Sequence, residues 1–195
     1  MTRHLLADDD LTPEEQAEIL ALAATIKKAP FAHRPLDGPR TVALVFDRPT
    51  LRTQVSFSAG IAELGGHPMT VDGGLAAMGK REGVADVARV LGRQASAIVW
   101  RTAHQSDLET MAQHCGVPVV NALTDEYHPC QLLADLQTVQ EHKGTLAGLR
   151  VAFVGDGACN MGSSWVLAGA TAGMHVVVAA PRGYQPDPGV VARAQ

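Results

Sequence analysis

Two short segments of the chain carry residue types that bind phosphate and carbonyl groups. The first is Thr50-Leu51-Arg52-Thr53, which follows an apolar run at 41–46 and opens a stretch with apolar residues at helical spacing. The first turn of a helix offers unpaired backbone N–H groups and the positive end of the helix dipole, and an arginine adds a two-pronged charged contact. The pattern therefore predicts a phosphate-binding site.

The second segment is His128-Pro129-Cys130-Gln131, and a further arginine, Arg101, stands directly after another apolar run. In open α/β sheets, ligands bind beyond the carboxyl ends of the strands. Because each of these sites follows a predicted strand, we expect two arginines, a histidine and several hydroxyls to meet at one sheet edge. Such a group suits a small dianion that also carries a carbonyl.

Each of these residues also has a purely structural interpretation. Arg101 fits a solvated charge at the end of a strand, and His128, before a proline, fits a side chain that caps a helix. Thr50 and Thr53 fit caps of the helix that they open, a role compatible with phosphate binding. The functional prediction therefore depends on all of these residues lying at one edge.

The segments that position these residues alternate between strands and helices. Strands are predicted at short apolar runs, namely 41–46, 68–71, 97–100, 117–120, 150–154 and 175–179. Helices are predicted between them, at 51–64, 83–93, 105–114, 131–142 and 160–172. This order favours an α/β fold, a parallel sheet with helices on both faces.

An N-terminal helix is predicted from a capping-box pattern. Thr12 and Glu15 flank a proline at the first helical position, and the helix is expected to run to about Lys28. Its apolar face is predicted to comprise Ile19, Leu20, Leu22, Ala23 and Ile26.

A polar stretch with two glycines, near residues 141–148, predicts a domain junction. One domain is expected at 1–143, and the beginning of a second, incomplete α/β domain at 144–195. Asp187 and Pro188 open another predicted helix close to the end of the chain. Two strands are too few for an independent α/β domain, so the pattern favours a chain that is cut short.

Composition excludes several classes of protein. The 195 residues are 46% hydrophobic and carry a net charge of −4 with no basic stripe, which argues against a nucleic-acid partner. No run approaches the roughly 20 apolar residues of a membrane helix, and the N-terminus turns acidic before a signal-peptide core, so the cytoplasm is the expected location. Cys115, Cys130 and Cys159 are widely spaced, which predicts reduced thiols that pack in the protein and bind no metal.

The two polar segments resemble the turns that hold carbamoyl phosphate in the aspartate/ornithine carbamoyltransferase family, S-x-R-T and H-P-x-Q. The resemblance covers the whole chain and is closest to the ornithine branch at 128–135 and 154–161. It implies a carbamoyl-phosphate-binding domain at 1–143 and the start of an ornithine-binding domain at 144–195. The implied reaction moves the carbamoyl group of carbamoyl phosphate to the δ-amine of L-ornithine, giving citrulline and phosphate in arginine biosynthesis.

The resemblance also implies roles for individual residues. Residues 50–53 would bind the phosphate, and Asn160 would contact the amino-acid substrate. The carbamoyl group would be held by Arg101, by Gln131 and by the turn His128-Pro129-Cys130. Three residues would polarise its carbonyl and so act in catalysis, namely Arg101, His128 and Thr53. The resemblance implies no cofactor, no metal and a homotrimer, while composition argues against a nucleic-acid or membrane partner.

The chain departs from the family pattern at several positions. Gln54 stands where the family has a second arginine, and Cys159 stands where asparagine is common. Ala77 stands where ornithine enzymes often carry a glutamine that reaches a neighbouring subunit, a role that Lys80 would have to take over. The family's Asp-x-x-x-Ser-Met-Gly and His-Cys-Leu-Pro segments have no counterpart within the 195 residues, so this chain alone is not expected to make citrulline at a useful rate.

Three alternatives stay open at this point. The chain could be a shortened paralogue that keeps only the carbamoyl-phosphate half of the site and is not an enzyme. The acceptor could be another amine or an acylated ornithine. The glycines of 154–162 follow a predicted strand as in a nucleotide-binding α/β protein, although the third glycine is displaced and no acidic residue follows the next strand.

Overall fold

The computed structural model describes residues 2–72, 78 and 81–195, which form two compact units. Unit 1 comprises Met1–Leu6 and Ile26–Thr124, and unit 2 comprises Ala7–Thr25 and Asp125–Gln195. Each unit therefore combines segments from two separate parts of the sequence. Among the helices of the described ranges, none has the length and apolar character needed to cross a bilayer.

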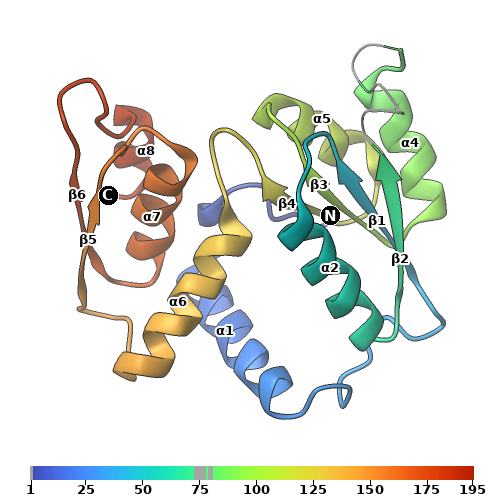
Figure 1. The fold of residues 1–195 in the computed structure, drawn as a ribbon, viewed down its shortest axis with the longest axis horizontal. Coiled ribbons are helices and arrows are strands. Elements are labelled where there is room, and N and C mark those ends of the chain that lie inside the picture. Colours follow the sequence, from blue (N-terminus) through green and yellow to red (C-terminus); the bar gives the residue numbers. More distant parts are fainter. Residues whose placement is uncertain (1, 73–77, 79–80) are drawn as a thin grey trace. The chain divides into compact units, whose positions relative to one another are not determined.

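Unit 1 is built on a parallel sheet (Figure 1). Across the described part of the chain its strands lie in the order β2-β1-β3-β4, with the bounds β1 Thr41–Phe46, β2 His67–Asp72, β3 Ala97–Arg101 and β4 Val119–Leu123. All three pairings are parallel, so the carboxyl ends of these strands share one edge of the sheet. Leu5 adds a parallel bridge to Val120.

Helices cover both faces of this sheet. Successive side chains of a strand point to opposite sides, so β1 contributes residues to a core on each face. Ala43 and Val45 of β1 belong to a core cluster with residues of α4 (Val84–Gln94) and α5 (Gln105–Cys115). Val42 and Leu44 belong to a second cluster, which includes Ile61 and Phe57 of α2 (Leu51–Glu63). The centre of β1 is buried on both sides, as its continuous apolar run requires. The predicted α/β fold is confirmed.

Unit 2 contains a short parallel pair of strands and several helices (Figure 1). Its strands are β5 Arg150–Val154 and β6 His175–Ala179. Its helices are η1 Asp8–Asp10, α1 Pro13–Lys28 as far as Thr25, α6 Pro129–Lys143, α7 Asn160–Thr171 and α8 Pro188–Arg193. Buried side chains from three of these helices and from the turn before β6 form its main core, namely Leu20, Leu132, Leu136, Ala168 and Met174.

The predicted helix starts are confirmed in their side-chain bonds. The Thr12 N–H donates to Glu15 Oε2 at 2.9 Å, and the Glu15 N–H donates to Thr12 Oγ1 at 3.2 Å, which completes the capping box of α1. Asp187 accepts from the N–H groups of Gly189 and Val190 and so caps α8. Local sequence is sufficient to fix these helix starts.

Two predictions about elements were wrong in detail. The strand expected at 117–120 is shifted to Val119–Leu123, with the polar Asn121 fully buried inside it. The side chains of Ile19 and Leu22, expected on the apolar face of α1, are exposed. Gln16 is buried instead, and its amide is satisfied there because its Nε2 donates to the Ala168 carbonyl at 3.1 Å.

Candidate functional site

The predicted phosphate segment lies at the carboxyl end of β1, where the chain enters α2. Thr50 is the N-cap residue, with an extended backbone (φ −155°, ψ 117°) and no capping bond from its side chain. Leu51, Arg52 and Thr53 form the first turn. The side chain of Leu51 is 78% exposed, so any contact that it makes with a phosphate would come from its backbone N–H. We call Arg48, Thr50, Arg52, Thr53 and Arg101 the arginine edge.

Arg101 joins this turn to the neighbouring strand. It is the last residue of β3, and its Nη1 donates to the Thr53 hydroxyl at 3.2 Å. Among the described residues its Nε is buried and has no hydrogen-bond acceptor. A buried donor left in this way costs the folded protein free energy unless a further acceptor binds. Arg101 is thus a partly buried guanidinium with a donor to spare, rather than a solvated strand-end charge.

The arginine edge concentrates positive charge. Burial, and then the charges of Arg48 and Arg52, lower the pKa of Arg101 from its ordinary value. Like charges that repel one another in a partly buried place favour the binding of an anion. Arg48 was not singled out from the sequence, although its position two residues before the phosphate turn at 50–53 was a usable signal.

The backbone of Arg101 is fixed by its neighbours. The pairing of β3 with β4 shifts register between Trp100 and Arg101, an irregularity that re-aims a side chain at a strand end. The indole N–H of Trp100 donates to Asp47 Oδ2 at 2.9 Å, and the Asp47 N–H donates to the Arg101 carbonyl at 3.1 Å. Burial raises the pKa of Asp47, while bonds from Thr102 and Trp100 act in the opposite direction.

His128 begins the second predicted segment, in unit 2. It is the N-cap residue of α6, with φ −140° and ψ 62°, and its side chain makes no capping bond to that helix. Pro129 follows at the first helical position, which is why α6 begins there and not at Gln131 as expected. The His128 N–H donates to the Ser164 hydroxyl oxygen at 2.8 Å. The backbone of the histidine is therefore tied to α7.

The next residues of this turn differ in what they offer a ligand. Burial, and then the charge of Asp8, raise the pKa of the Cys130 thiol to about 12, so the thiol stays protonated at neutral pH. The side chain of Gln131 is exposed, and its Nε2 donates to Asp135 Oδ1 at 2.9 Å. The raised pKa argues against a nucleophilic role for Cys130, and Gln131 is the accessible amide.

Asn160 is the first residue of α7 and follows the glycine-containing stretch after β5. A Cβ on Gly162 would lie 2.4 Å from the Gly157 carbonyl oxygen, so glycine is needed where the helix packs on this stretch. Asp156 accepts from the Ala158 N–H at 2.9 Å. Close packing accounts for the Gly162 position without a nucleotide.

The structure brings together some of the predicted site residues directly. In unit 1, a hydrogen bond connects Arg101 with Thr53. In unit 2, His128 to Gln131 form one turn, and Asn160 lies in the same unit. Ala77 and Lys80 lie outside the described residues.

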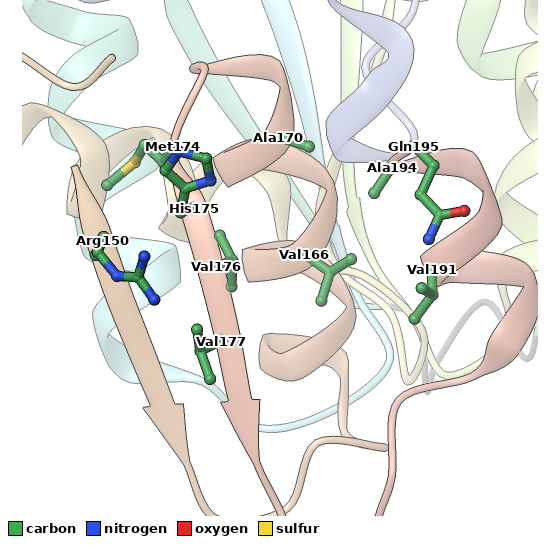
Figure 2. A pocket seen from close by; sticks show the side chains of 10 residues that line it. All are labelled: Arg150, Val166, Ala170, Met174, His175, Val176, Val177, Val191, Ala194 and Gln195. Carbon is green, nitrogen blue, oxygen red and sulfur yellow. The ribbon is translucent and has the colours of Figure 1, made fainter. Parts of the chain in front are cut away.

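A cavity of about 390 Å³ opens in unit 2 beside α7, α8 and the paired strands (Figure 2). Valine, alanine and methionine side chains make up most of its lining, with Arg150 and His175 at the N-terminal ends of β5 and β6. None of the predicted site residues lines it. Gln195 is the third polar residue of the lining.

Comparison with protein families assigns both parts of the chain. Residues 3–141 match the carbamoyl-P binding domain of aspartate/ornithine carbamoyltransferase, and residues 147–195 match the Asp/Orn binding domain. The chain is 57% identical over its whole length to an ornithine carbamoyltransferase of Mycobacterium ulcerans and 58% identical to one of Mycobacterium leprae. It spans 63% and 64% of the length of these relatives.

Solved structures of ornithine carbamoyltransferases also match this chain in fold and sequence. The ornithine carbamoyltransferase from Pyrococcus furiosus matches 99% of this chain with a TM-score of 0.92 at 41% identity, and the match covers 62% of that chain. The ornithine carbamoyltransferase from Gloeobacter violaceus matches all of this chain with a TM-score of 0.90 at 42% identity, over 64% of its own length.

Proposed function

Since the chain belongs to the aspartate/ornithine carbamoyltransferase family, we propose that it supplies the carbamoyl-phosphate half of an ornithine carbamoyltransferase site. The observation that carries this proposal is the arginine edge. There, Arg101 donates to Thr53 at the start of α2, and its buried Nε has no acceptor among the residues that the structure describes. Phosphate would bind to the first turn of α2 and to Arg52, with the carbamoyl oxygen near Arg101.

The proposed reaction is an acyl transfer. The neutral δ-amine of L-ornithine attacks the carbamoyl carbon, and a C–N bond forms while charge builds on the carbonyl oxygen. Arg101, His128 and Thr53 would stabilise that charge as donors already in place, and each such donor typically contributes about 10²–10³ in turnover. The C–O bond to phosphate then breaks, the δ-nitrogen loses its proton, and citrulline and phosphate are the products.

The remaining roles are also part of the proposal. Gln131 would hold the carbamoyl amide, Pro129 and Cys130 would contribute the backbone of the turn, and Asn160 would contact the amino acid. The proposed assembly is a homotrimer in the cytoplasm, and the proposed reaction is a step of arginine biosynthesis. An acceptor other than ornithine is less well supported, because the relatives from Mycobacterium ulcerans and Mycobacterium leprae are named ornithine carbamoyltransferases.

Binding measurements with two ligands test the proposal. Carbamoyl phosphate and inorganic phosphate are titrated by calorimetry into the parent chain and into Arg101→Ala and His128→Ala variants. Arg101→Ala should weaken carbamoyl phosphate because a donor to the carbamoyl oxygen is lost, and it should weaken inorganic phosphate because one positive charge of the arginine edge is lost. His128→Ala should weaken carbamoyl phosphate alone, because inorganic phosphate has no carbonyl.

Arg89→Ala is the matched control. Arg89 is an exposed arginine of α4 that pairs with Asp86 at 2.7 Å, outside the arginine edge. Its removal should leave both affinities unchanged. Equal affinities of the parent and the Arg101→Ala chain for both ligands would contradict the proposed site.

A further inference from the structure

Asp8 is a buried carboxyl group for which the proposed reaction has no use. Asp8 lies in η1 and is only 3% exposed, and its carboxyl group accepts a hydrogen bond from the Ser164 hydroxyl. The two residues are 156 positions apart in the sequence. Burying a carboxyl is costly, so the arrangement calls for a reason beyond packing.

Ser164 connects Asp8 to the candidate catalytic turn, because it is hydrogen-bonded to both. Ser164 is fully buried, and while its hydroxyl donates to Asp8, its oxygen accepts from the His128 N–H at 2.8 Å. A hydroxyl that donates to a carboxyl becomes a better acceptor, so the two bonds strengthen one another. A continuous chain of bonds therefore runs from Asp8 through Ser164 to the backbone of His128.

A second set of contacts holds the residue before His128. Arg193 of α8 binds the Asp9 carboxylate through Nε, at 2.9 Å, and through Nη2. Its Nη1 donates to the Tyr127 hydroxyl at 2.6 Å, and the guanidinium lies 5.3 Å from the centre of the Tyr127 ring. Adjacent carboxyl groups of η1 are thus connected to adjacent residues of the turn.

We propose that Asp8 and Ser164 are positioning residues, which fix the backbone of His128 so that its imidazole meets the carbamoyl group. This inference rests on the proposed function of His128. An N-cap residue lies outside the hydrogen-bond ladder of its helix, so its N–H needs a partner from elsewhere. Small displacements of a catalytic group reduce its contribution strongly, which makes such a partner valuable.

The test uses the full 195-residue chain and the same two ligands. Ser164→Ala and Asp8→Ala should weaken carbamoyl phosphate about three- to tenfold, the range expected for one hydrogen bond. Neither variant should alter the affinity for inorganic phosphate, which the arginine edge holds. Asp8→Asn should keep near-parent affinity, because the amide oxygen can still accept from the Ser164 hydroxyl.

Ser163→Ala is the control, since Ser163 is a buried serine of the same helix that is not part of the Asp8–Ser164–His128 chain. It should bind both ligands as the parent does. Hydrogen exchange of the His128 amide gives an independent readout, and its protection should fall in Ser164→Ala and stay unchanged in Ser163→Ala.

The outcomes separate this inference from the proposed function. If His128→Ala weakens carbamoyl phosphate but Ser164→Ala does not, the positioning role is wrong and the function stands. If Ser164→Ala weakens both ligands equally, its role is general stability and the inference is overturned. If His128→Ala binds carbamoyl phosphate as the parent does, the function proposed for His128 fails, and the positioning role fails with it.

Discussion

Asp8 makes the stability of unit 2 depend on pH. Burial raises the pKa of this carboxyl from 3.8 to about 7, against the effect of the Ser164 bond, and the charges of Asp9 and Asp10 act in the same direction as burial. Between about pH 4 and 7 the unfolded chain has released this proton while the folded chain retains it. The contribution of Asp8 to the free energy of unfolding therefore falls as the pH rises through this window.

Replacing Asp8 by Asn removes this ionisation. Between pH 4.5 and pH 8 the parent should lose stability that Asp8→Asn keeps. The free energy of unfolding of the variant, relative to that of the parent, should therefore rise over this range by at most about 4 kcal/mol, the equivalent of three pKa units. The groups that face Asp8, namely Asp9, Asp10, Cys130 and Ser164, are the same in both chains. Urea unfolding at several pH values measures the difference, and parallel pH curves would show that Asp8 has an ordinary pKa.

The thiols should differ in their reactivity towards alkylating reagents. Because the pKa of Cys130 is about 12, only a minute fraction of it is thiolate at pH 8. Cys130 should stay unmodified in the folded chain while all three cysteines react in guanidinium chloride, and peptide mass spectrometry identifies the modified sites. Rapid labelling of Cys130 in the folded chain would contradict the raised pKa of this thiol.

Interior glycines of α2 and α4 respond to different surroundings. A Cβ on Gly92 would lie 1.7 Å from the Cys115 carbonyl oxygen, where α4 packs against α5. A Cβ on Gly60 of α2 would meet nothing within 4 Å. The same substitution therefore tests close packing against helix propensity.

Gly92→Ala should destabilise unit 1 by about 1–3 kcal/mol, because backbone has to move to admit the methyl group. Gly60→Ala should stabilise it by up to about 1 kcal/mol, because alanine favours the helix. Chemical unfolding followed by circular dichroism gives both values. A stabilising Gly92→Ala would mean that α4 and α5 are further apart than described.

Sequence alone predicted those elements whose signals are local. The bounds of β1, β5 and β6 are as predicted, and the capping box of α1 forms between residues three positions apart. β4 was misplaced because Asn121 looks like a strand end. Its amide Nδ2 donates to the Leu6 carbonyl at 2.7 Å, a partner 115 positions away that local sequence does not indicate.

In the candidate site, too, the features with local sequence signals were predicted and the long-range contacts were not. The turn at 50–53 and the turn at 128–131 were identified from their own residues, and the bond between Thr53 and Arg101 agrees with the expectation that strand ends meet. The contacts that support the turns were not predicted. Asp47, Ser164 and Arg193 act through partners from distant segments, and each of them alone is an ordinary polar residue in the sequence.

For the whole molecule, we predict substrate binding without turnover. The ornithine-recognising segments that the family resemblance implies have no counterpart in the 195 residues, whereas the arginine edge is present. The purified chain should bind carbamoyl phosphate and form no citrulline above the uncatalysed background when ornithine is added. A colorimetric citrulline assay, with a full-length relative as positive control, measures this, and steady turnover by the 195-residue chain would contradict the prediction.

The discontinuity of unit 2 sets an order of events during synthesis on the ribosome. Residues 7–25 are made before the rest of unit 2, but Asp8 has to await Ser164, and Asp9 has to await Arg193, 184 positions later. At translation rates of about 5–20 residues per second, Asp8 remains without its partner for roughly 8–30 s. During that time Leu20 still lacks Ala168 and Met174, two of the residues that complete its core cluster. Helix α1 is thus made well before its core is complete, and during that interval it is a segment that a chaperone can bind.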